Sequence, residues 1–148
     1  MDPTGQESER RSGRIGAPAA VLVFGLWTLF VWGGRLRNLW LDPGGFADAS
    51  RWSLVGSIVF TLLGLAVVAA WLADRLGSAS NSSSGPGILR LVLWPLAGLT
   101  TVVWLLRAAD ISLGDHSIGF IVVHLVLAVV SVGLAVISVA ALTRATVG

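Results

Sequence analysis

The sequence predicts an all-α protein, a four-helix transmembrane bundle. Hydrophobic residues make up 55% of the 148-residue chain and charged residues only 12%, whereas soluble domains carry about 25% charged residues. The apolar residues are concentrated in four runs, each long enough to cross about 30 Å of hydrocarbon as a helix. Trp and Arg gather at the ends of these runs, with Trp32, Trp52 and Trp104 near the outer interface, which is typical of the aromatic belts of membrane proteins.

The four predicted spans cover about residues 17–34, 52–73, 88–107 and 117–143. Together they form one transmembrane domain, 17–143. The polar segment ahead of it, 1–16, is rich in Arg, Glu, Gly and Ser and is predicted to be a disordered cytoplasmic tail. The first run is longer than a signal-peptide core and no small-residue cleavage site follows it, so we interpret it as an uncleaved span.

Turn and capping residues separate the spans. The sequence Asp42-Pro43-Gly44-Gly45 is typical of a turn and ends the helix before it, and Asp48 or Ser50 can cap the second span. Residues 77–87 are rich in Gly and Ser and predict a flexible cytoplasmic linker within the domain.

The placement of Arg predicts the orientation. With the N-terminus inside, six Arg lie on the cytoplasmic side and four on the outer side, and the cytoplasmic side normally carries the excess. We therefore expect both termini in the cytoplasm. All ten basic residues are Arg, a bias typical of high-GC bacteria, so the predicted location is the inner membrane of a bacterium, as a multi-pass protein.

The chain lacks the residues that several classes of function require. The chain contains no Cys, which excludes disulfides and thiolate chemistry. Motifs of phosphate-binding loops, metalloproteases and serine hydrolases do not occur, and the scattered Arg residues form no basic stripe for nucleic acid. We expect no enzyme activity, no catalytic residue, no cofactor, no metal site and no binding to nucleic acid.

An internal echo links the first and third spans. Thr28, Val31, Trp32 and Arg35 recur as Thr, Val, Trp and Arg 72 residues later, from Thr100 to Arg107. One interpretation is a pair of pseudo-repeated helix hairpins whose Arg residues flank a shared outer vestibule. The other is that Trp and Arg mark span ends independently.

A stripe of small residues on the fourth span predicts a helix-packing seam. The stripe has a 4-3-4-3 spacing that places its members on one helix face, where Ala and Ser allow helices to approach closely in lipid. Its members are Ser117, Ile121, His124, Ala128, Ser131, Ala135 and Ser138.

His124 is the first candidate for a polar or ligand-binding site, because a titratable residue inside a span is costly. It should point into the bundle and form a hydrogen bond across the interface, with Thr100, Thr101 or a backbone carbonyl as partner. It either only holds helices together or serves a ligand. A shared metal or haem with His116 is excluded, since eight residues separate them by about 12 Å along a helix.

The outer rim supplies the other candidates. Arg35, Arg107, Asp110, Asp115 and His116 lie there among balanced charges, and Arg107 can pair with Asp110 on one helix face. This rim is either a pocket for a lipid headgroup or small anion or a solvated, charge-balanced surface.

Two segments carry a family resemblance: GGRLRNLWLDPGG and LLRAADISLGDHSIGFIVVHLVLAVVSVGLA. They resemble small, uncharacterised four-span membrane proteins of high-GC Gram-positive bacteria over about residues 17–142. The resemblance implies a multi-pass inner-membrane location and no particular reaction.

Two hypotheses for function remain. The first is a non-enzymatic structural or interaction component that packs in the lipid bilayer against a membrane-protein partner or a second copy of itself. The second is a lipid- or small-molecule-binding subunit of a transporter or quinone-linked complex. A cavity between the spans near His124 would favour the second hypothesis, and a filled interface the first.

Overall fold

The computed structural model describes residues 18–79 and 86–145. The predicted tail, 1–16, and the middle of the predicted linker lie outside these residues. Every regular element in the described part of the chain is helical, which confirms the predicted fold class. The elements are α2 (Ala19–Thr28), η1 (Leu29–Gly33), α3 (Gly34–Leu41), α4 (Gly45–Asp48), α5 (Arg51–Ala79), α6 (Pro86–Leu113) and α7 (Ile118–Arg144).

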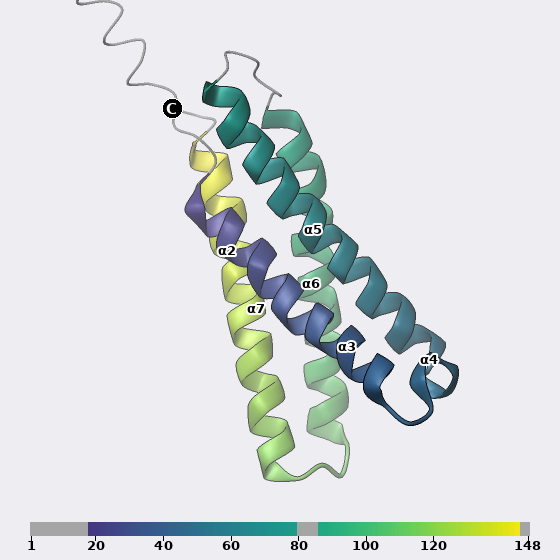
Figure 1. The fold of residues 1–148 in the computed structure, drawn as a ribbon. Coiled ribbons are helices and arrows are strands. Elements are labelled where there is room, and N and C mark those ends of the chain that lie inside the picture. The colour runs from purple at the N-terminus through teal and green to yellow at the C-terminus, as the bar shows by residue number, and fades with distance from the viewer. Residues whose placement is uncertain (1–17, 80–85, 146–148) are drawn as a thin grey trace, which may run out of the picture.

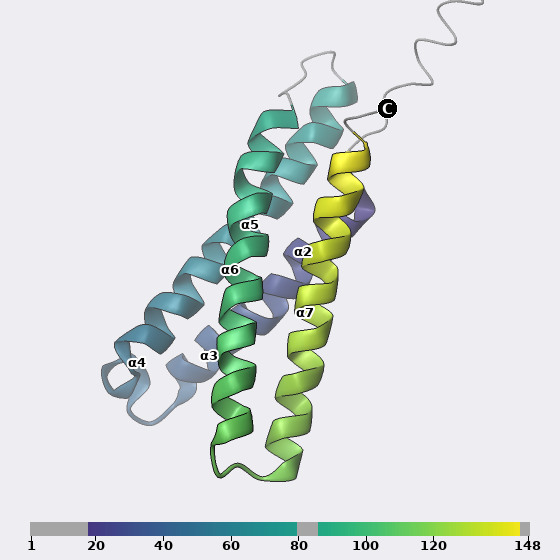
Figure 2. The same ribbon diagram turned by 180° about the vertical axis from the view of Figure 1, so that it is seen from behind.

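Within the described residues, four helical segments are long and apolar enough to cross a membrane: Ala19–Leu41, Arg51–Leu76, Gly87–Leu113 and Ile118–Arg144. They make the chain a multi-pass membrane protein. Successive spans run in opposite directions, so α2 begins and α7 ends at the same end of the bundle (Figure 1). The α2 helix packs against α5 and α7, and α6 packs against the same two helices, which closes a ring of four (Figures 1 and 2).

The first span is longer than the sequence predicted. It continues from η1 into α3, past residue 34, and ends at Leu41, after which Asp42 adopts an extended backbone. No helix-breaking residue occurs between Gly34 and Asp42, and Leu36 and Leu39 are half-buried, so the apolar side of the helix is maintained. The turn predicted at Asp42–Gly45 does end it, with Gly45 at φ +55°.

Serine side chains mark the starts of two spans. The Ser50 hydroxyl accepts a hydrogen bond from the amide of Ser53 (3.2 Å) at the start of α5, as predicted for this residue. Ser117 accepts one from the amide of Phe120 (3.4 Å) at the start of α7. The long helices also include both ends of the predicted linker, because α5 ends at Ala79 and α6 begins at Pro86.

The α2 helix is joined to its neighbours by close packing and hydrogen bonds. A Cβ atom on Gly64 of α5 would lie 3.2 Å from two carbons of Leu29, so the two backbones approach closely there. On the α7 side, the Trp27 indole donates to Ser131 Oγ (2.9 Å) and Ser138 Oγ donates to the carbonyl of Ala20 (2.9 Å).

Candidate functional site

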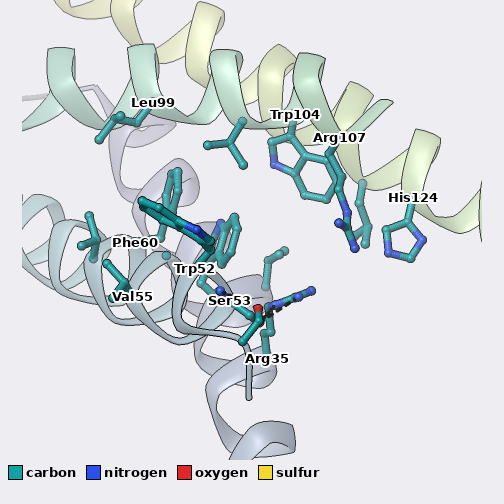
Figure 3. Close-up of a pocket in the computed structure, with 16 residues that line it drawn as sticks. Arg35, Trp52, Ser53, Val55, Phe60, Leu99, Trp104, Arg107 and His124 are labelled. Carbon is teal, nitrogen blue, oxygen red and sulfur yellow. Dashed lines mark hydrogen bonds between the residues drawn. The ribbon is translucent and has the colours of Figure 1, made fainter. Parts of the chain in front are cut away.

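A cavity of about 590 Å³ lies between the spans, near the end of the bundle where α3 leaves and α5 begins. Side chains from all four spans line it (Figure 3). The first span supplies Trp32 and Arg35, α5 supplies residues from Ser53 to Phe60, α6 supplies Trp104 and Arg107, and α7 supplies His124 and Leu127. A volume of this size accommodates a small molecule or part of a lipid.

The walls of the cavity are aromatic and aliphatic. Trp32 stacks on Phe60, with ring centroids 4.3 Å apart and planes inclined by only 7°. Trp104 lies opposite and is 6% exposed, and Val103 and Leu127 complete this side. Trp32 and Trp104, predicted for the outer aromatic belt, therefore face the interior, whereas Trp52 at the rim is exposed.

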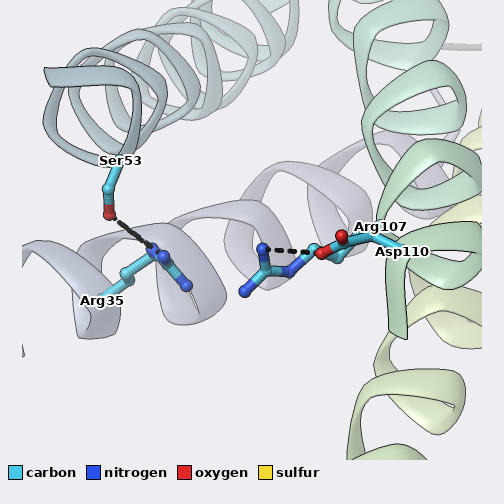
Figure 4. Close-up of polar contacts among 4 residues, drawn as sticks. All are labelled: Arg35, Ser53, Arg107 and Asp110. Atoms are coloured by element: carbon cyan, nitrogen blue, oxygen red, sulfur yellow. Dashed lines mark hydrogen bonds and ion pairs between the residues drawn. The ribbon is translucent and has the colours of Figure 1, made fainter. Parts of the chain in front are cut away.

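Two guanidinium groups reach the cavity from different helices. Arg35 donates from Nε and Nη2 to Ser53 Oγ, at 3.3 and 3.0 Å. Arg107 forms an ion pair with Asp110 across a long 3.6 Å separation. The two guanidinium groups point towards each other (Figure 4), and their like charges repel. Within the described residues, no carboxylate pairs with Arg35, so this part of the cavity carries excess positive charge.

A π turn in the first span sets the position of Arg35. Val21, Phe24, Gly25 and Thr28 are buried, and a regular α-helix would continue this buried stripe at Arg35, seven residues after Thr28. The π turn η1 accommodates an extra residue, which turns the following side chains by about 100°. Leu36 takes the half-buried place instead, and Arg35 is exposed at the edge of the stripe. This turn was not predicted from the sequence, although it ends at Gly33, the first of two consecutive glycines.

His124 lies at the rim of the cavity but does not form the predicted hydrogen bond. Its Nδ1 lies 2.8 Å from the carbonyl of Phe120 in its own helix, and Thr101 bonds to Ala97. The prediction of a bond across the interface is therefore wrong. The reason is local, because the carbonyl four residues earlier on the same helix lies within hydrogen-bond distance of the ring.

The two copies of the internal echo meet at the cavity. Val31, Trp32 and Arg35 line it from the first span, and their counterparts 72 residues later line it from α6. The two helices are diagonal in the ring and run in the same direction (Figure 1). The arrangement therefore brings the paired Arg residues to one shared vestibule.

Two buried polar atoms near this side of the bundle have no hydrogen-bond partner among the described residues: Trp104 Nε1 and Thr100 Oγ1. Each such group costs about 1–3 kcal/mol. The nitrogen of Trp104 is on the ring edge that faces Phe60 and Trp52 across the cavity (Figure 3).

The remaining rim candidates lie outside the cavity. Asp110 does not line the cavity but forms an ion pair with Arg107, which does. Asp115 and His116 are exposed in the connection before α7. The ring of Phe120 lies between the two imidazoles. Its centroid is 4.8 Å from that of His116 and 4.0 Å from that of His124.

The predicted seam divides into two parts. Ala128, Ser131, Ala135 and Ser138 are buried, and Ser131 and Ser138 bond to the first span. Ser117 is exposed and caps α7. The prediction that it packs against another helix is therefore wrong. The first span does not reach this outermost turn, because it has already diverged from α7 and packs against α5.

No protein-family model matches the chain, and neither a curated protein nor a solved structure is similar to it. Of the resemblance described from the sequence, only the four candidate spans are therefore supported, and no family or homologue is identified.

Proposed function

We propose that this protein binds an anionic lipid, with the phosphate of the headgroup between Arg35 and Arg107 and the upper part of an acyl chain against the aromatic wall. The convergence of two guanidinium groups on one cavity carries this proposal. It corresponds to the second of the two hypotheses from the sequence, for which a cavity near His124 was the criterion.

The charge balance supports an anion. The Arg35 guanidinium is held by a neutral hydroxyl and faces a second guanidinium, so a phosphate between them would remove repulsion as well as add charge-assisted hydrogen bonds. Asp110 neutralises Arg107 only weakly, because the ion pair is long and the side chains of Arg107 and Asp110 are 42% and 68% exposed.

The apolar wall supports a lipid rather than a free anion. Trp32, Phe60, Val59 and Leu99 continue the cavity from the Arg pair towards the middle of the bundle. A soluble phosphate would leave this surface unused, whereas an acyl chain would cover it through van der Waals contacts, which drive packing within lipid. Serving as a binding component, the chain needs no catalytic group.

The proposed setting is the inner membrane of a bacterium with both termini in the cytoplasm. The cavity lies at the end of the bundle opposite the start of α2 and the end of α7, so it would open towards the outer leaflet. A transporter or another membrane complex is the proposed partner that receives or senses the lipid.

Lipid binding in detergent, measured by native mass spectrometry, tests the proposal. Phosphatidylglycerol should bind more tightly than zwitterionic phosphatidylcholine. R35Q and R107Q should each weaken its binding about five- to thirtyfold, the range expected of a partly exposed charged hydrogen bond. Soluble glycerol phosphate should compete poorly if the acyl chain contributes as proposed.

R37Q is the matched control, since Arg37 is exposed on the same short helix and does not line the cavity. Its affinity for phosphatidylglycerol should stay within twofold of wild type. Equal losses in R35Q and R37Q would show general electrostatic attraction instead of a site.

A further inference from the structure

The hydrogen bond of His124 fixes which ring nitrogen carries the proton. Nδ1 lies 2.8 Å from the carbonyl of Phe120, and a carbonyl oxygen only accepts hydrogen bonds, so Nδ1 must donate. In the neutral ring, Nε2 is then a bare acceptor. It lies on the side of the ring that faces Arg107 (Figure 3).

The other polar groups around the cavity differ from Nε2. Arg35, Arg107 and Trp104 can only donate hydrogen bonds. Ser53 Oγ already accepts from Arg35, and Ser50 Oγ accepts from the amide of Ser53. In the described part of the chain, His124 Nε2 takes part in no hydrogen bond, so it is an acceptor left for a ligand, next to donors that suit an anion.

We infer that His124 selects an anionic lipid whose headgroup bears a hydroxyl beside the phosphate, such as a glycerol or inositol headgroup. This inference rests on the proposed function, because the Arg pair must first hold the phosphate. The hydroxyl then donates to Nε2 while the phosphate accepts from the guanidinium groups, so one headgroup satisfies both kinds of group at the rim.

Two lipids of equal charge isolate the hydroxyl. Phosphatidylglycerol and phosphatidylmethanol with the same acyl chains both carry one negative charge, and only the first has free hydroxyls. Wild type should bind phosphatidylglycerol about three- to tenfold more tightly, as expected of one net hydrogen bond. H124F should lose this preference and keep its affinity for phosphatidylmethanol, because a phenyl ring retains the contact with Phe120 but has no acceptor.

Two further variants separate selection from folding. H124Q should retain part of the preference, since its amide oxygen can accept the same hydrogen bond. H116F should retain all of it, because His116 also contacts Phe120 but does not line the cavity.

The outcomes distinguish the two proposals. Equal affinity of wild type for both lipids, with R35Q still impaired, would overturn the role of His124 and leave the lipid site standing. The same preference in H124F as in wild type would also overturn it. Failure of wild type to bind either lipid would overturn the proposed function itself.

Discussion

Replacing Gly64 with Ala should destabilise the bundle and weaken ligand binding together. The new Cβ would lie 3.2 Å from Cγ and Cδ2 of Leu29 and 3.3 Å from Cγ2 of Thr28, closer than ordinary van der Waals contact. Overpacking of this kind costs about 1–3 kcal/mol, and the better helix propensity of Ala returns up to about 1 kcal/mol. We therefore expect a net loss of up to about 2 kcal/mol in the free energy of unfolding.

The substitution at Gly64 should also affect the cavity, because Gly64 contacts the start of the π turn. Leu29 is the first residue of the π turn, and this turn sets the orientation of Trp32 and Arg35. A displaced Leu29 should shift both, so phosphatidylglycerol affinity should fall as well.

G98A is the matched control for this prediction. Gly98 also lies within a span, but a Cβ there would meet nothing within 4 Å. Its stability should be unchanged or slightly raised. The assay is unfolding of each variant by titration with a denaturing detergent, followed by lipid binding. Equal stability and affinity in G64A and G98A would refute the close approach of the first span to α5.

Three other predictions address the packing and the orientation. A135L should lower stability by about 1–3 kcal/mol because Ala135 is 1% exposed, and V136L on the open face should lower it less in the same unfolding assay. A double-mutant cycle of W27F and S131A should give a coupling energy of about 0.6–1.7 kcal/mol for the interhelical hydrogen bond, and no coupling would contradict that bond. A phosphatase fused to the C-terminus should be inactive in cells, and an active fusion would reverse the proposed orientation.

The sequence was sufficient for the parts of the fold that lipid dictates. A span must be continuous, apolar and helical, so the four runs could be assigned from composition alone. The buried stripe from Ala128 to Ser138 follows from helix periodicity and the small size of its side chains. The turn at Asp42 follows from the conformational limits of Pro and Gly.

The parts that the sequence could not provide depend on packing between spans. The π turn in the first span has no sequence pattern of its own, yet it decides where Arg35 lies. The partner of His124 was misassigned because an intrahelical carbonyl competes with every more distant acceptor for the Nδ1 hydrogen. Trp32 and Trp104 were assigned to the membrane interface, since position along a span does not say whether a ring faces lipid or a cavity.

The most direct test of the lipid site is photo-crosslinking in vesicles. A phosphatidylglycerol analogue with a photoreactive group near the headgroup would be crosslinked to the wild-type protein, and the modified residues mapped by peptide mass spectrometry. Labelling should concentrate at the cavity residues around the two Arg side chains, such as Ser53, Trp104 and His124, should be competed by unlabelled phosphatidylglycerol, and should be lost when Arg35 and Arg107 are both replaced by Gln. Labelling spread over the exposed faces of the spans, with no competition and no effect of the double replacement, would contradict a lipid site in this cavity.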